Sequence, residues 1–163
     1  METRKIFEYA LMKEKEGLEF FKSAAVRAQN SEAKSIFSKL IDEEIKHIKF
    51  IKEQIGSIKD GAEVSKQLAT ELNADNYFEK RAQKDLLEQT ISESMVPDIS
   101  ILHFAYIIER DLSEFYAKSA QDAEGSAMEA LLMLAEWEKS HEKFFKEIHD
   151  KLMEMYSNQP WGG

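Results

Sequence analysis

Residues 135–145 read AEWEKSHEKFF, and they place a glutamate and a histidine among the hydrophobic positions of a predicted helix. Glu138 and His141 are three residues apart, so in an α-helix both side chains lie on the same face. A carboxylate and an imidazole directed at one point can be metal ligands, an acid–base pair or a coincidence of composition. The rest of the sequence has to decide between these three interpretations.

The composition favours one helical domain. The chain has 163 residues, of which only two are proline and six are glycine, and this favours long helices over strands and turns. The net charge of −9 argues against sequence-independent binding to nucleic acid, because phosphates attract basic surfaces. The absence of cysteine excludes disulfides, thiol catalysis and cysteine-ligated iron within this sequence. We find no signal peptide and no membrane span in the sequence, and we therefore expect a cytoplasmic protein without a membrane partner.

Four segments have hydrophobic residues spaced three and four apart, which is typical of helices that bury one face. The first two segments form a predicted hairpin over residues 3–56, in which Asn30 or Ser31 caps the second helix and Gly56 ends it. The last two segments form a second predicted hairpin over residues 97–156. Two such hairpins are the halves of a four-helix bundle.

The hairpins are separated by residues 57–96, which are polar and include a predicted short helix within residues 76–89. A helix of about 26 residues spans roughly 40 Å, and a connection this long can cross the full length of a bundle. We therefore predict an all-α, ferritin-like four-helix bundle made of two hairpins joined by a long crossover. Residues 1–158 form this single domain, and residues 159–163 are a flexible tail.

The two predicted hairpins repeat one another. EIKHIKFIKE, which starts at Glu44, aligns with EKSHEKFFKE, which starts at Glu138, at an offset of 94 residues. EKEGLEFFKSAA, which starts at Glu14, aligns with ERDLSEFYAKSA, which starts at Glu109, at an offset of 95. Each hairpin therefore has one glutamate on its first helix and a Glu-x-x-His pair on its second. The residues that interrupt the hydrophobic stripes in this way are Glu14, Glu44, His47, Glu109, Glu138 and His141.

Burial of these carboxylates needs a compensating charge. An unpaired carboxylate in a core costs several kcal/mol, and this core would hold four of them. Two divalent cations would supply +4 against the −4 of the carboxylates, and two neutral imidazoles would add nothing. Carboxylate-rich ligation with one imidazole per metal suits iron or manganese. We expect two iron ions, with manganese or a mixed pair as alternatives, and a metal-free bundle with buried ion pairs is the competing interpretation.

Other notable side chains are interpreted as structural. Glutamates outside the hydrophobic stripes read as solvated charges, and these are Glu16, Glu19, Glu43 and Glu136. His103 and His149 have no partner at the ligand spacing and are interpreted as surface or packing histidines. Trp137 can relay electrons, but packing is the favoured interpretation.

The stretches EKEGLEFF, EEIKHIKF, ERDLSEFY and EKSHEKFF resemble the ferritin-like superfamily, and most closely its rubrerythrin-related diiron-carboxylate proteins. The resemblance covers both hairpins. It implies that Glu14 and Glu109 are ligands from the first and third helices, that Glu44 and Glu138 bridge or nearly bridge the metals, and that His47 and His141 are terminal nitrogen ligands. It also implies that Tyr116 donates a hydrogen bond to a ligand carboxylate, whereas its counterpart Phe21 can only pack.

Two departures from the classical rubrerythrins affect the expected activity. Those proteins carry a cysteine-rich, rubredoxin-like domain that feeds electrons to the iron pair, and this chain has no cysteine. They also carry an extra glutamate one turn after the third-helix ligand, where this chain has Leu112. Electrons would therefore come from outside the chain, and the six-residue ligand set is also similar to a bacterioferritin ferroxidase centre.

The favoured hypothesis is a diiron oxidoreductase, active against oxidative stress, that reduces hydrogen peroxide or dioxygen with electrons from an external donor protein. The alternative is a ferroxidase, iron-binding or iron-storage protein whose substrate is Fe(II). A metal-free helical interaction module is the third hypothesis. By analogy with the family, we expect a homodimer.

Overall fold

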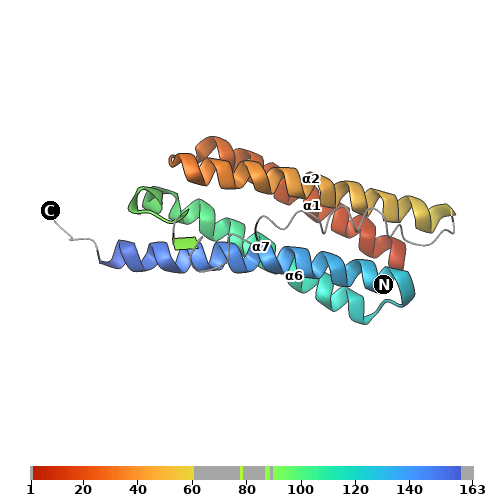
Figure 1. Ribbon diagram of the computed structural model, residues 1–163. Coiled ribbons are helices and arrows are strands. Elements are labelled where there is room, and N and C mark those ends of the chain that lie inside the picture. The colour runs from red at the N-terminus through yellow and green to blue at the C-terminus, as the bar shows by residue number, and fades with distance from the viewer. Residues whose placement is uncertain (1, 61–77, 79–86, 89, 159–163) are drawn as a thin grey trace.

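The computed structural model describes residues 2–60, 78, 87, 88 and 90–158. These residues form helices and contain no strand, and the predicted all-α four-helix bundle is confirmed (Figure 1). The four long helices are α1 (Thr3–Arg27), α2 (Ser31–Asp60), α6 (Ile99–Gln121) and α7 (Gly125–Ser157), and the short 3-10 helix η1 (Glu93–Asp98) precedes α6.

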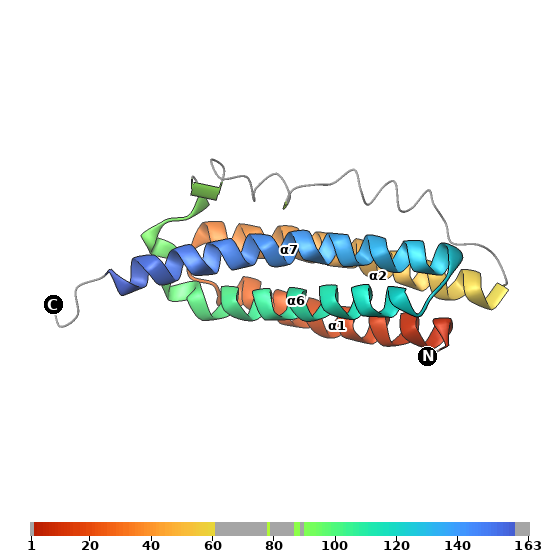
Figure 2. The same cartoon turned by 90° about the horizontal axis from the view of Figure 1, so that it is seen from below.

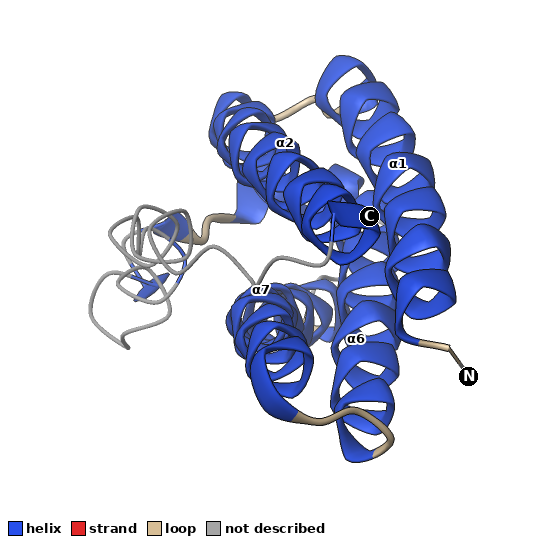
Figure 3. Cartoon of the chain, turned by 90° about the vertical axis from the view of Figure 1, so that its right-hand side faces the viewer, coloured by secondary structure: helices blue, strands red, loops and turns tan. Residues whose placement is uncertain are grey.

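The helices pair as the repeat predicts. Helices α1 and α2 form one antiparallel hairpin, and α6 and α7 form the other (Figures 1 and 2). Seen end-on, α1 lies beside α6 and α2 lies beside α7, so each helix directs one face toward a common interior (Figure 3). None of the described helices is both long and apolar enough to span a bilayer.

The turn between α1 and α2 is held by two side chains. Oδ1 of Asn30 accepts a hydrogen bond from the backbone N–H of Ala33 at 3.0 Å, as predicted for a helix N-cap. The buried carboxylate of Asp98, which belongs to the second half of the chain, accepts the backbone N–H groups of Gln29 and Asn30 at 2.8 and 2.9 Å. This carboxylate therefore fastens the start of α6 to the turn of the first hairpin.

The boundaries differ from the prediction in one place. Helix α2 continues through Gly56 to Asp60, because Ile58 beyond the glycine still packs against the core, as Ile55 does before it. A glycine inside a helix costs only about 1 kcal/mol, and this packing outweighs the cost. The predicted short helix within residues 76–89 and the predicted tail at 159–163 lie outside the described residues, apart from residues 78, 87 and 88.

The core consists of two apolar clusters with a polar layer between them. One cluster contains Phe21 of α1 and Phe37 of α2, and the other contains Phe7 of α1 and Phe50 of α2. On every long helix, residues of the first cluster and residues of the second lie on opposite sides of a buried glutamate. The fold therefore places these glutamates at one level in the middle of the bundle, between two water-excluding layers.

Candidate metal centre

All six predicted ligands meet in the polar layer. Their side chains come from all four long helices, and each residue is at most 3% exposed. They form two groups in which one ligand atom of every residue lies within 4.8 Å of the others: Glu14, Glu44, His47 and Glu138 in one, and Glu44, Glu109, Glu138 and His141 in the other. We call these the Glu14–His47 position and the Glu109–His141 position. The two positions share Glu44 of α2 and Glu138 of α7.

Both histidines direct Nδ1 at the carboxylates. Nδ1 of His47 lies 2.8 Å from Oε1 of Glu138 and 3.6 Å from Oε2 of Glu44. Nδ1 of His141 lies 3.3 Å from an oxygen of each shared carboxylate and 3.5 Å from Oε2 of Glu109. The two imidazole rings are nearly parallel, with centroids 5.7 Å apart. The Glu-x-x-His spacing on α2 and α7 therefore brings each imidazole to the same point as its carboxylate, as the helical period requires.

A second set of buried groups holds the ligands in place. The hydroxyl of Tyr116 donates a hydrogen bond of 2.6 Å to Oε1 of Glu14, so the hydrogen bond expected from the resemblance is present and its acceptor is Glu14. Phe21, the counterpart of Tyr116 in the repeat, is fully buried and packs against Phe37. On the side of the His141 ring that points away from the shared carboxylates, Nε2–H donates a hydrogen bond to Oε2 of Glu43.

The interpretation of Glu43 as a solvated surface charge is therefore wrong. Glu43 is only 7% exposed and lies between α2 and α7. Helix α2 buries two adjacent ridges of side chains, and Glu43 belongs to the ridge that contains Ile36, Leu40, His47 and Phe50. The three-and-four spacing of these residues is a signal in the sequence from which the burial of Glu43 can be predicted.

Aromatic residues surround the two imidazoles. Trp137 stacks on His47 with ring centroids 5.2 Å apart. Phe78 contacts the ring of His141 edge-on at 4.7 Å, and the sequence does not assign it to the site because it lies outside the two repeated hairpins. His103 and His149 belong to neither metal group, and their rings lie 4.6 Å apart, which agrees with their interpretation as packing histidines.

The cluster contains more hydrogen-bond acceptors than the surrounding protein has donors for. Of the eight carboxylate oxygens on the four glutamates, six are buried without a hydrogen-bond partner, and they belong to Glu14 (Oε2), Glu44 (both), Glu109 (both) and Glu138 (Oε2). A buried polar atom left unpaired costs roughly 1–3 kcal/mol, and more if charged. Hard divalent cations with a preference for oxygen ligands would satisfy these atoms. The donor set therefore fits a pair of iron or manganese ions.

The pKa is raised for two of the four clustered carboxyl groups and lowered for the other two. Burial raises the pKa of Glu14 and of Glu109 well above 4.5, and the nearby charges of Glu138 and Glu44 raise it further. Burial also opposes ionisation of the two shared glutamates. The positive charge of His47 and the close approach of neighbouring side chains nevertheless hold the pKa of Glu44 at about 2 and that of Glu138 well below 4.5.

The pKa values of the two histidines are raised, whereas burial alone lowers the pKa of an imidazole. Burial opposes their protonation, but the carboxylates of Glu138 and Glu44 raise the pKa of His47 to about 10. Glu109 is the strongest of the charges that raise the pKa of His141 well above 6.5. These directions favour protonated imidazoles beside ionised Glu44 and Glu138, and they oppose ionisation of Glu14 and Glu109.

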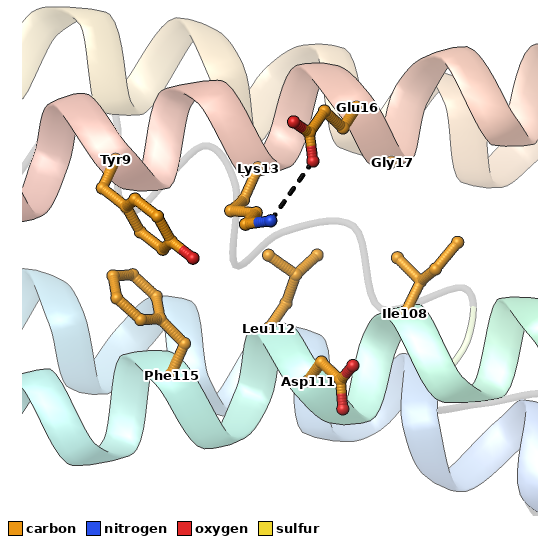
Figure 4. Close-up of a pocket in the computed structure, with 8 residues that line it drawn as sticks. All are labelled: Tyr9, Lys13, Glu16, Gly17, Ile108, Asp111, Leu112 and Phe115. Atoms are coloured by element: carbon orange, nitrogen blue, oxygen red, sulfur yellow. Dashed lines mark hydrogen bonds and ion pairs between the residues drawn. The ribbon is translucent and has the colours of Figure 1, made fainter.

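A pocket of about 400 Å³ lies between α1 and α6 (Figure 4). An ion pair of 3.4 Å between Lys13 and Glu16 lies along it. Gly17 and Leu112 also line the pocket, and each follows a glutamate of the cluster by three residues, which is about one helical turn. Leu112, at the position of the extra glutamate of classical rubrerythrins, is therefore part of an apolar wall. The complete lining is Tyr9, Lys13, Glu16, Gly17, Ile108, Asp111, Leu112 and Phe115.

Comparison with known proteins agrees with this geometry. A family model described as rubrerythrin matches residues 5–149, a span that includes all four long helices at least in part and every residue of the two metal groups. No curated protein and no solved structure matches the chain. Because the family match extends over most of the sequence, the chain belongs to the rubrerythrin family of diiron-carboxylate proteins.

Proposed function

We propose that the protein is a diiron-carboxylate oxidoreductase that reduces hydrogen peroxide or dioxygen with electrons from an external donor. The observation that carries the proposal is the pair of overlapping, fully buried groups that share Glu44 and Glu138. Two metal ions bound by these groups would share two carboxylates and so could act together on one small molecule. The family match supports the same proposal.

Each residue has a role in this proposal. Glu14 and His47 would hold one ion, Glu109 and His141 would hold the other, and the two shared glutamates are placed to serve both. The four carboxylates balance the charge of two divalent ions, and the apolar clusters on either side exclude bulk water. Two ferrous ions held there would supply the two electrons that, together with two protons, reduce one hydrogen peroxide to two water molecules.

Access and orientation are also provided by the chain. Tyr116 fixes the orientation of Glu14 through its hydrogen bond of 2.6 Å. The pocket between α1 and α6 is a route by which a small oxidant can approach, since it lies about one turn from the two terminal glutamates. Because the sequence has no cysteine, we propose that a separate redox protein, or Fe(II) itself, returns the electrons.

A ferroxidase or iron-binding function is the second candidate. The observation that favours it is Leu112, which stands where a seventh ligand would be and leaves six ligands in the two groups. A ferroxidase uses Fe(II) as substrate and moves the oxidised iron on, whereas an oxidoreductase retains its iron and is re-reduced in place.

Anaerobic loading with two Fe(II) per chain, followed by mixing with hydrogen peroxide or dioxygen, tests both functions. For the oxidoreductase, we expect one peroxide to oxidise two bound Fe(II), and an added reductant to restore repeated turnover without loss of iron. For the ferroxidase, we expect dioxygen to oxidise Fe(II) far beyond two equivalents. The Glu44→Ala/Glu138→Ala double variant is the control and should retain no iron. Failure of the wild-type chain to bind two metal ions would refute both functions and leave the metal-free interaction module.

A further inference from the structure

The two metal positions have nearly identical ligands but different surroundings. Each has one terminal glutamate, one histidine and the two shared carboxylates. The side chain next to each histidine breaks this symmetry. Glu43 on α2 and Trp137 on α7 occupy equivalent places in the repeat, at the same offset of 94 residues that relates the two histidines. A carboxylate therefore stands where the other half of the molecule has an indole.

The carboxylate acts on the Glu109–His141 position. Nε2–H of His141 donates to Oε2 of Glu43, while Nδ1 of the same ring faces the shared carboxylates. A carboxylate that accepts the outer N–H of a ligating histidine fixes the ring and makes its other nitrogen a stronger donor. Both side chains are buried, and the low local dielectric strengthens this hydrogen bond.

Glu43 is not itself one of the ligands. Its carboxylate contacts the nitrogen of His141 that points away from the cluster, and neither metal group includes it. It therefore acts through His141 as a positioning residue.

A second difference weakens the Glu14–His47 position. There, the hydroxyl of Tyr116 donates to Glu14 and withdraws electron density from this terminal carboxylate. At the equivalent place beside Glu109, the repeat has Phe21, and both oxygens of Glu109 are without a hydrogen-bond donor. The two differences act in the same direction. Glu43 strengthens the ligand His141 at the Glu109–His141 position, and Tyr116 weakens the ligand Glu14 at the Glu14–His47 position.

We propose that Glu43 makes the two metal positions unequal, so that the Glu109–His141 position binds a divalent ion more tightly and fills first, while the Glu14–His47 position exchanges its ion more readily. The inference rests on the proposed dimetal site and adds an order of filling to it. An oxidoreductase built this way would retain one ion while the other was lost or replaced.

Titration of the metal-free chain with Co²⁺, followed by the visible spectrum and by calorimetry, tests the inference without reference to activity. For wild type we expect two resolved steps. His141→Ala should abolish the tight step, and His47→Ala should abolish the weak one. Glu43→Gln keeps the size of the side chain and removes its charge, and it should weaken the first step by roughly 10- to 100-fold, so that the two steps merge.

The matched control is Glu142→Gln. Glu142 is as buried as Glu43 and adjoins His141 in sequence, but its ion pair, 3.0 Å long, is with Lys139. This variant should leave the separation of the two steps unchanged. Tyr116→Phe supplies an independent test, because it should tighten the weak step and leave the tight step in place.

Each result has one meaning. Two equal steps in wild type would overturn the inference while leaving the dimetal site intact, as would a Glu43→Gln variant that titrates like wild type. Binding of fewer than two Co²⁺ by wild type would overturn the proposed function, and this inference with it. Should Glu43→Gln fail to fold by circular dichroism, unchanged steps in Tyr116→Phe together with loss of the weak step in His141→Ala would overturn the order of filling.

Discussion

Loading the metal-free protein with two divalent ions should release about four protons at neutral pH. Before loading, the surrounding carboxylates favour the protonated forms of His47 and His141 by raising their pKa, and burial favours the neutral forms of Glu14 and Glu109 by raising theirs. All four must be deprotonated to serve as metal ligands. The net charge of the cluster is zero in both states, because four protons are exchanged for two ions of charge +2.

The dependence of metal-binding free energy on pH follows from the linkage between metal binding and proton release. Each proton released makes the free energy of metal binding more favourable by about 1.4 kcal/mol per pH unit. For four protons the gain is about 5 kcal/mol per pH unit over the binding of both ions. Metal binding therefore becomes stronger as the pH rises. The gain fades as the pH approaches 10, where the metal-free protein itself loses the proton of His47.

Calorimetric titration with Co²⁺ in two buffers of different ionisation enthalpy counts these protons directly. The matched variant is Glu14→Gln, which keeps the shape of the side chain and removes one titrating group, so it should release about one proton fewer if it still binds two ions. Release of one proton or none by wild type would show that the ligands are already deprotonated. It would refute the charge assignment of the metal-free cluster while leaving the metal site itself intact.

Three further predictions concern stability. In the metal-free protein, the stabilisation contributed by protonated His47 is complete below its unfolded pKa of 6.5 and is lost as pH rises toward about 10. The melting temperature should therefore fall over this pH range. The metal-loaded protein, measured in parallel, should show a smaller fall. Asp98→Ala removes the acceptor of the N–H groups of Gln29 and Asn30 and should cost about 3 kcal/mol in urea unfolding, whereas Asp111→Ala, at an exposed position of α6, should cost much less. Gly17→Ala should stabilise the protein by about 0.5–1 kcal/mol, because the added Cβ would meet Ile108 at an ordinary contact distance of 3.5 Å; a lower melting temperature would show that α1 and α6 cannot accept the methyl group.

The fold could be predicted from the sequence because long helices leave strong periodic signals. The repeated Glu-x-x-His pairs added a constraint that periodicity alone does not supply. Residues at the same offset in two similar hairpins must occupy equivalent places, and the interruption of four hydrophobic stripes at one level predicts a shared polar layer. The structure brings Glu14, Glu44, Glu109 and Glu138 together in such a layer.

What could not be predicted depends on contacts between helices. The burial of Glu43 can be read from the spacing of its ridge on α2, but its contact with His141 on α7 cannot. The acceptor chosen by Tyr116 is on α1, 102 residues away in sequence. The contact between Phe78 and His141 comes from the segment between the two hairpins, which lies outside the repeat. Each of these contacts requires the three-dimensional packing, which sequence spacing does not encode.

The charge balance of the cluster also determines which experiment can separate the three hypotheses. A bundle whose buried carboxylates lacked all compensation would unfold without metal, and chelation would then reveal the metal by loss of structure. Here the raised pKa values of the two imidazoles favour positive charges that offset Glu44 and Glu138, and burial favours the neutral forms of Glu14 and Glu109. The metal-free chain can therefore stay folded. Folding after chelation is expected of a diiron protein and of an interaction module alike, and only the uptake of two metal ions with release of protons distinguishes them.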